Sequence, residues 1–165
     1  MKLNLIYNTF KDISIVGVDQ EKAINFCKDK HKFGEFYIDY FENPTVKNLK
    51  ADLIICADFI EHLNKPELLL NYIKQNLNEG GFILLSTLER DLLRGKSNLT
   101  PLNKFHIREL NKEELKEFLT SEGFKIIKHK LQFPVKLRRN RLMNKEVISR
   151  FKEGKPLKYN QGYAS

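Results

Sequence analysis

The sequence is poor in cysteine and has no long apolar run, and each shortage restricts what the protein can be. Cys27 and Cys56 are the only two cysteines among 165 residues, and they lie far apart in apolar patterns. We therefore expect reduced core thiols in a cytoplasmic protein rather than a disulfide or a metal-binding pair. No apolar run reaches the ~20 residues of a membrane span, and the first residues are too short an apolar stretch for a secretory signal.

Histidine is also scarce, because only four are scattered along the chain and none has the spacing of a zinc site. The sequence alone therefore predicts no metal site. What remains is the composition of an ordinary globular protein, with 41% apolar and 30% charged residues. A chain of this length and composition can fold as one domain with a real core.

The net charge of +8 is unevenly distributed. From Lys125 onward there are 12 basic and 2 acidic residues, whereas the preceding part of the chain is slightly acidic. Such a tail is either a solvated end or a contact for phosphate-rich partners or an anionic membrane surface. The tail has no basic motif interleaved with aromatic residues, which argues against a nucleic-acid partner. We divide the chain into an α/β domain over residues 1–134 and a basic extension over residues 135–165.

Strand patterns alternate with helical patterns along the first 131 residues. Apolar runs predict five strands, the last of them at a sheet edge, over residues 12–19, 35–39, 51–57, 82–87 and 124–131. Helical spacing predicts a helix over residues 20–30, a second that begins near Pro66 and ends at Gly80–Gly81, and a third that begins at Asn111 and stops at Gly123. This alternation predicts an α/β fold with a mostly parallel sheet.

In such a sheet, ligands bind outside the carboxyl ends of the strands. Asp19 and Asp39 end the first two predicted strands, and Cys56, Ala57 and Asp58 end the third. A carboxylate at a strand end can accept hydrogen bonds from a ribose diol or from an exocyclic amine. The alternatives are that Asp19 and Asp58 cap the segments that follow them and that Asp39 forms a turn.

Two segments carry a resemblance to a known family. They are the apolar strand and acidic turn from Ala51 to Leu63, which ends Glu-His-Leu, and the Gly-Gly-strand segment from Asn78 to Thr87. From about Lys11 to Leu131 the chain resembles the class I S-adenosylmethionine-dependent methyltransferases. The resemblance implies a Rossmann-like sheet and S-adenosylmethionine as cofactor, with S-adenosylhomocysteine as product. It also implies that the ribose is bound by Asp19, the adenine by Asp39, and the methionine moiety by Cys56, Ala57 and Asp58.

A second resemblance, to one branch of the family, lies at residues 86–95 and 101–110. In that branch a Ser-Thr-Pro-Asn/Asp-Arg segment leads to an Asn-x-x-His-x-Arg-Glu segment on the substrate side, whereas this chain has Leu88 and Glu89 at the third and fourth positions. By this resemblance His106 and Arg108 face a small-molecule or sugar-type acceptor, as catalytic or acid-binding groups. The alternative is a loop held by its own hydrogen bonds. His62 is either a base or a structural histidine.

The glycine-rich loop of the family is missing, because none of the eight glycines forms a Gly-x-Gly-x-Gly motif. We therefore expect a domain that is truncated at its amino end, in which residues 1–10 match at best the tail of the first helix. The absent strand belongs between the strands at 12–19 and 51–57. We expect the gap to be filled by residues 1–8 as a strand, by a partner subunit or a second copy, or by direct pairing of the two strands.

These observations favour a methyltransferase that acts on an unidentified acceptor, and the loss of the loop is expected to impair it. The alternative is a non-catalytic, methyltransferase-like binding or regulatory module that a partner subunit or a homodimer completes. A protein that binds nucleic acid through the basic tail is the third hypothesis.

Overall fold

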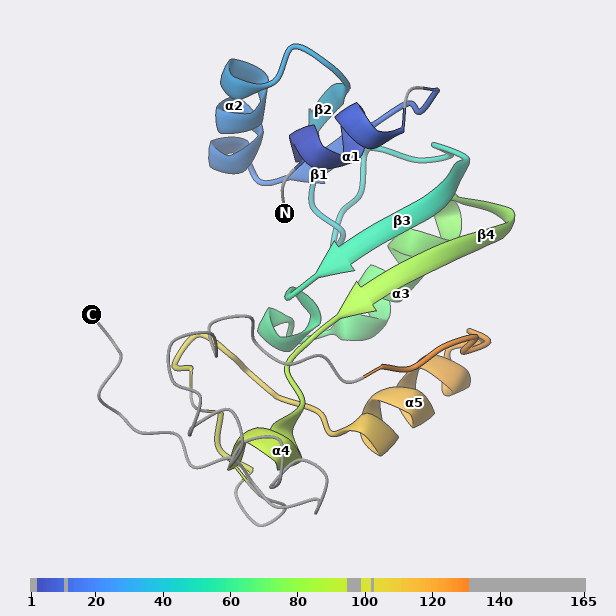
Figure 1. The fold of residues 1–165 in the computed structure, drawn as a ribbon. Coiled ribbons are helices and arrows are strands. Elements are labelled where there is room, and N and C mark those ends of the chain that lie inside the picture. Colours follow the sequence, from blue (N-terminus) through green and yellow to red (C-terminus); the bar gives the residue numbers. More distant parts are fainter. Residues whose placement is uncertain (1–2, 11, 95–98, 102, 131–165) are drawn as a thin grey trace, which may run out of the picture. The chain divides into compact units, whose positions relative to one another are not determined.

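The computed structural model describes residues 3–10, 12–94, 99–101 and 103–130 (Figure 1). The expected basic extension over 135–165, with its boundary after residue 134, lies outside them. The chain divides into two compact units, one made of Met1–Ile54 and Leu68–Phe82 and the other of Ile55–Glu67 and Ile83–Ser165. Among the described residues, no helix is both long and apolar enough to cross a bilayer.

The first unit contains helix α1 (Leu3–Thr9), strand β1 (Val16–Asp19), helix α2 (Glu21–Lys30) and strand β2 (Glu35–Ile38). Strands β1 and β2 pair in parallel, with Val16 opposite Glu35 and Asp19 opposite Ile38. Gly17 is required in β1, because a Cβ atom there would lie 2.7 Å from the Phe36 ring. The predicted helix and the second strand are thus confirmed to within one residue, whereas the first strand begins at Val16 and not at residue 12.

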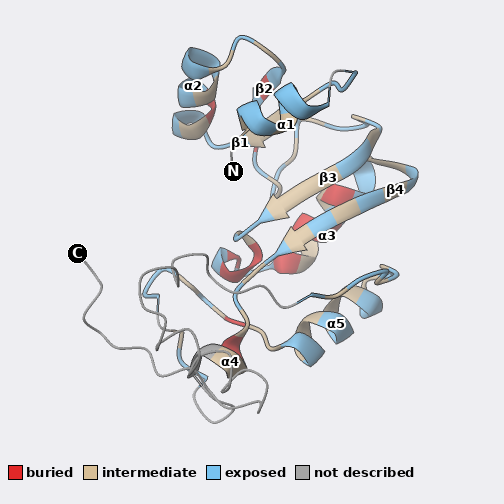
Figure 2. Cartoon of the chain, in the orientation of Figure 1, coloured by how far each residue is buried: buried red, intermediate tan, exposed pale blue. Residues whose placement is uncertain are grey.

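Helix α3 (Pro66–Asn76) follows a short 3-10 turn, η1 (Ile60–His62). It begins at Pro66, as expected from the fixed φ of proline in a first helical turn. Its buried positions include Leu69, Leu70 and Ile73, which recur at helical spacing (Figure 2). These side chains are a large part of the apolar core.

Strands β3 (Ala51–Ala57) and β4 (Leu77–Ser86) form a second two-stranded sheet, and their arrows point the same way in Figure 1. Strand β3 has the predicted bounds. The prediction that the preceding helix runs to Gly80–Gly81 is wrong, because α3 stops at Asn76 and β4 begins at the next residue. The side-chain amide of Asn78 donates a hydrogen bond to the Asp52 carboxylate of β3 at 2.9 Å, which links this segment to the sheet. Gly80, with φ +74, lies within the strand instead of capping the helix.

Helix α5 (Lys112–Ser121) confirms the third predicted helix. Asn111 accepts a hydrogen bond from the Glu114 amide, and the Glu114 carboxylate accepts one from the Asn111 amide. This reciprocal pair satisfies two amide groups that a helix start leaves unpaired. Gly123, with φ +84, follows the helix in the left-handed region.

Three expectations about the sheet are wrong. Residues 3–9 form helix α1, so they supply no replacement strand. Their match to the tail of the family's first helix stays a prediction. Strands β1 and β3 belong to different two-stranded sheets and do not pair directly in the described part of the chain. Residues 124–130 form no strand, because a strand needs a hydrogen-bonded neighbour and no described segment provides one; residue 131 lies outside the described residues.

Candidate functional site

Asp19 and Asp39 lie side by side at the carboxyl ends of β1 and β2. The Asp39 amide donates to the Asp19 carbonyl at 3.2 Å, which continues the ladder past both strands. The Asp19 side chain is exposed, and one of its carboxylate oxygens accepts only a local bond, at 2.7 Å from the amide of Gln20. Because the side chain is exposed, its carboxylate can also accept a hydrogen bond from a ligand hydroxyl.

The Asp39 side chain has a different environment, because it is only 7% exposed. Its carboxylate accepts from the amide and hydroxyl of Thr45, each at 2.9 Å, from the Val46 amide at 2.9 Å and from the Tyr72 hydroxyl at 3.0 Å. Burial alone would raise the pKa of Asp39, but these donors outweigh it and lower the pKa from 3.8 to about 2. Burial, together with the Asp39 charge, raises the pKa of Tyr72.

These contacts favour the turn-forming alternative for Asp39. Both of its oxygens are already engaged by groups of its own unit, so its carboxylate is not arranged to take an adenine amine as well. Its role toward adenine stays a prediction.

The carboxyl end of β3 places Cys56, Ala57 and Asp58 in sequence. Asp58 has φ +50, a left-handed conformation that costs a residue with a Cβ about 1 kcal/mol. Two contacts to the end of β4 hold it there: its amide donates to the Ser86 carbonyl at 2.9 Å, and the Ser86 hydroxyl donates to its carboxylate at 3.2 Å. Backbone strain that neighbouring contacts maintain is common at functional sites.

Cys56 is half-buried, and burial raises the pKa of its thiol to about 11, with further contributions from the Glu61 and Asp58 charges. The thiol is therefore protonated at neutral pH, which disfavours a role as a nucleophile or as a thiolate ligand.

We expect Cys56 in the folded protein to react with iodoacetamide at least about 10-fold more slowly at about pH 8 than in the unfolded chain. The higher pKa reduces the thiolate fraction about 100-fold, and the greater nucleophilicity of that thiolate offsets part of the loss. Mass spectrometry of the Cys56 peptide in buffer and in urea measures both rates. Equal rates would show that the thiol is not held in the described environment.

Glu61 joins the strand end to the segment predicted to face the acceptor. It is only 2% exposed, and its carboxylate accepts from the Thr87 hydroxyl at 2.9 Å. Its main-chain carbonyl accepts from the amides of Ile107 and Arg108, at 2.9 and 3.3 Å. Sequence reasoning noted Glu61 beside His62 but gave it no role, because nothing local signals its contacts with residues 87 and 107–108.

The structure brings His62 and His106 together, although 44 positions separate them in the sequence. Their rings meet edge to face with centroids 4.7 Å apart. Nδ1 of His62 donates to the Phe105 carbonyl at 3.0 Å, and Nδ1 of His106 donates to the Glu109 carboxylate at 2.7 Å. Nε2 of His106 then accepts from the Asn103 amide at 2.9 Å.

Arg108 donates to the Asn64 carbonyl at 2.8 Å, so its guanidinium helps to pin its own segment. An open pocket of ≈ 440 Å³ lies beside it, and Arg90, Ile107 and Glu114 also line this pocket. Arg108 can therefore hold its loop through the bond to Asn64 and still border a pocket in which an acceptor could bind.

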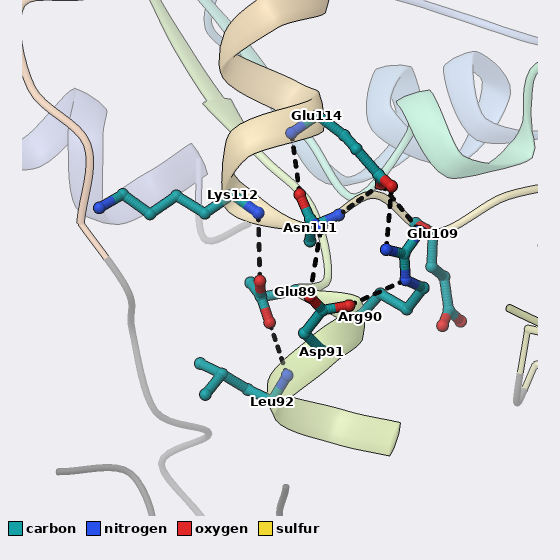
Figure 3. A network of polar contacts seen from close by, with 8 residues as sticks. All are labelled: Glu89, Arg90, Asp91, Leu92, Glu109, Asn111, Lys112 and Glu114. Atoms are coloured by element: carbon teal, nitrogen blue, oxygen red, sulfur yellow. Dashed lines mark hydrogen bonds and ion pairs between the residues drawn. The ribbon is translucent and has the colours of Figure 1, made fainter. Parts of the chain in front are cut away.

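Leu88 and Glu89 depart from the pattern of the resembling branch, and Figure 3 shows the contacts that hold the loop around Glu89. One oxygen of Glu89 accepts from the Leu92 amide at 2.7 Å in helix α4 (Arg90–Arg94), and the other accepts from the Lys112 amide at 3.1 Å in α5. A single carboxylate thus caps two helices. Its negative charge suits both helix N-termini.

Arg90 lies at the centre of the same network and is only 7% exposed. Its guanidinium donates two parallel bonds to the Glu114 carboxylate, at 2.8 and 2.9 Å, and one to Asp91 at 3.0 Å. The Glu114 hydrogen bonds raise the pKa of Arg90 despite its burial. Burial raises the pKa of Glu114, but the Arg90 and Asn111 bonds outweigh it and lower that pKa.

Comparison with known proteins gives this arrangement a context. The sequence model of a family described as "Methyltransferase domain" matches residues 4–129. A Mycolicibacterium smegmatis protein named "probable S-adenosylmethionine-dependent methyltransferase" is 37% identical over 113 residues, which are 68% of this chain and 44% of that protein. The chain therefore spans less than half the length of this curated relative.

Two solved structures resemble the fold at low sequence identity. An S-adenosylmethionine-dependent methyltransferase from Archaeoglobus fulgidus is 20% identical, with a TM-score of 0.58 over 89% of this chain and 73% of that one. The [4+2]-cyclase SpnF is 15% identical, with a TM-score of 0.60 over 77% of this chain and 49% of that one. At these identities the likeness concerns the fold alone.

Proposed function

Because this chain belongs to the methyltransferase-domain family, we propose that it binds S-adenosylmethionine and transfers a methyl group to a small-molecule acceptor. The family and the Rossmann-like α/β fold agree with the resemblance seen in the sequence. The cofactor, when bound, supplies a positively charged sulfonium whose methyl group is attacked by a nucleophile.

The carboxyl end of β3 is the observation that carries this proposal. Asp58 is held there in a left-handed conformation by Ser86. The negative charges of Asp58 and Glu61 are both felt at Cys56, where they raise the pKa of the thiol. Fixed carboxylates in a partly buried site stabilise a cation more than water-screened ones do. Ala57 adds no bulk at this turn. The residues present therefore fit a cationic sulfonium and the methionine moiety that carries it.

Asp19 supports the cofactor proposal within its own unit, because its exposed carboxylate keeps an oxygen available for a ribose hydroxyl. We do not assign Asp39 to the adenine, since four donors already use its oxygens. For the acceptor, we propose a small molecule, sugar-type compounds included, positioned near His106 and Arg108. Such sites act mainly by orienting the reactants and excluding water.

Isothermal titration calorimetry with S-adenosylmethionine and S-adenosylhomocysteine tests the cofactor proposal on the full chain. We expect Asp19→Asn to weaken binding by about 10- to 100-fold, because it replaces charge-assisted hydrogen bonds with weaker ones. Asp12→Asn changes an equally exposed aspartate outside the strand end and should bind as the unchanged chain does. The absence of heat at millimolar cofactor would overturn the proposal, and equal affinities of the two variants would remove the ribose role of Asp19.

A non-catalytic binding or regulatory module is the second candidate. The occupied carboxylate of Asp39 favours it, and SpnF illustrates that a protein of this fold can carry a different activity. In that case the chain would bind S-adenosylmethionine but would not convert it to S-adenosylhomocysteine with any acceptor of a tested panel. We also propose that a partner subunit or a second copy of the chain completes the sheet. The molecular mass of the purified protein in solution tests the second copy.

A further inference from the structure

We infer that Glu61, His62 and His106 bind one divalent transition-metal ion. One nitrogen of each histidine and one carboxylate oxygen of Glu61 all lie within 4.8 Å of one another. Two imidazoles and a carboxylate are a donor set used by catalytic zinc and non-haem iron sites, which keep further positions open. The inference concerns ion binding alone and does not depend on methyl transfer.

The hydrogen bonds of the two histidines leave one nitrogen of each ring for a ligand. A carbonyl only accepts, so the bond from His62 to Phe105 places a proton on Nδ1, and in the neutral ring the lone pair is then on Nε2. The Glu109 carboxylate and the Asn103 amide impose the same tautomer on His106. Histidines that bind metals commonly donate their other N–H to a carbonyl or a carboxylate in this way.

The environment of Glu61 calls for a cation. Its carboxylate is almost fully buried and accepts a bond from one neutral hydroxyl, that of Thr87. In the ranges that the structure describes, no Lys, Arg or His forms an ion pair with it. Buried carboxylates are normally paired with a cation or coordinated to a metal, because desolvation of an unpaired charge is costly.

The geometry sets what binding requires. Zinc–ligand distances of about 2.0–2.1 Å put the ligand atoms of a tetrahedral site about 3.4 Å apart. The present separations of up to 4.8 Å must therefore shorten. The exposed ring of His62 can rotate to do this, and His106 must exchange its Asn103 bond for the metal. Imidazole ligands favour Zn²⁺ or Co²⁺ over Mg²⁺ or Ca²⁺.

Calorimetric titration of the untagged, chelator-treated full chain with Zn²⁺ tests the inference in the absence of cofactor. We expect one ion per chain, and a visible absorption band when Co²⁺ is used instead. His62→Gln and His106→Gln should each weaken binding by at least about 100-fold, more than typical changes outside the ligand shell. His129→Gln is the matched control, because His129 is not part of the cluster, and it should leave the affinity unchanged.

Two results would overturn the inference: failure of the unchanged chain to bind either ion, or equal affinities for His62→Gln and His129→Gln. His62 is exposed, so its replacement should leave the protein folded, and circular dichroism checks this. Because no cofactor is added, failure to bind metal does not contradict the methyltransferase proposal. Failure to bind S-adenosylmethionine likewise does not contradict the metal-site inference.

Discussion

Replacement of Asp39 by asparagine is expected to lower the free energy of unfolding by about 3 kcal/mol. The carboxylate accepts four hydrogen bonds, from the amide and hydroxyl of Thr45, the Val46 amide and the Tyr72 hydroxyl. Asparagine keeps one oxygen but places an NH₂ group against the donors on the other side. Hydrogen bonds to charged groups contribute about 1.5–3 kcal/mol each, and a buried donor left unpaired costs about 1–3 kcal/mol.

Urea denaturation of Asp39→Asn beside Asp19→Asn isolates this effect. Asp19 ends the neighbouring strand with the same side chain, but it is exposed and accepts one local bond. Its replacement should change stability by less than about 0.5 kcal/mol. Similar losses in the two variants would mean that the Asp39 network does not stabilise its loop.

The same network predicts an acid-dependent loss of stability. The folded pKa of Asp39, about 2, lies below its ordinary value of 3.8, so folding favours the ionised form. This contribution is fully present above about pH 4 and is lost as the pH falls toward 2. Asparagine does not ionise, so the free energy of unfolding of Asp39→Asn should fall less between about pH 4 and pH 2 than that of the unchanged chain.

Replacement of Arg90 by glutamine is expected to destabilise the second unit by about 2–3 kcal/mol. The change removes a buried guanidinium that donates to Glu114 and Asp91 and leaves both carboxylates without it. Loss of one partner of a buried pair costs about 3–5 kcal/mol. We expect somewhat less here, because the Glu114 side chain is 41% exposed and water can solvate it.

Glu113→Gln provides the control for Arg90→Gln, since Glu113 lies beside Glu114 in α5 but is exposed. Guanidinium denaturation should show little change for it. Amide hydrogen exchange adds a local readout, because Arg90→Gln should speed the exchange of Leu92 and Lys112, whose amides are capped by Glu89 next to the network. Unchanged exchange together with unchanged stability would contradict the role given to Arg90.

The parts of the fold that sequence predicts well are those fixed by local chemistry. Strand β3 (Ala51–Ala57) is an apolar run interrupted by Asp52 alone, and α5 is marked by the reciprocal pair Asn111 and Glu114. The end of α3 was misplaced because glycine is a frequent but not obligatory stop. There the chain pairs with β3 from Leu77 onward, and local sequence does not reveal this pairing or the bond between Asn78 and Asp52.

The site shows the same division. The pattern of apolar strands ending in acids locates Asp19, Asp39 and Asp58 at strand ends, yet it cannot distinguish an available carboxylate from an occupied one. Asp39 is engaged by Tyr72, 33 positions away. Likewise, spacing rules find metal ligands that are neighbours in sequence, whereas His106 reaches Glu61 and His62 only through the fold.

The main-chain carbonyl of Glu61 has a consequence for how acceptor preference can change. It holds the segment that is predicted to face the acceptor by two amides, those of residues 107 and 108, rather than by their side chains. Every amino acid except proline offers such an amide. Side chains along this segment can therefore be exchanged for others during evolution while its attachment to the Glu61 carbonyl persists. If the segment faces the acceptor as predicted, selectivity can change without a change in the scaffold.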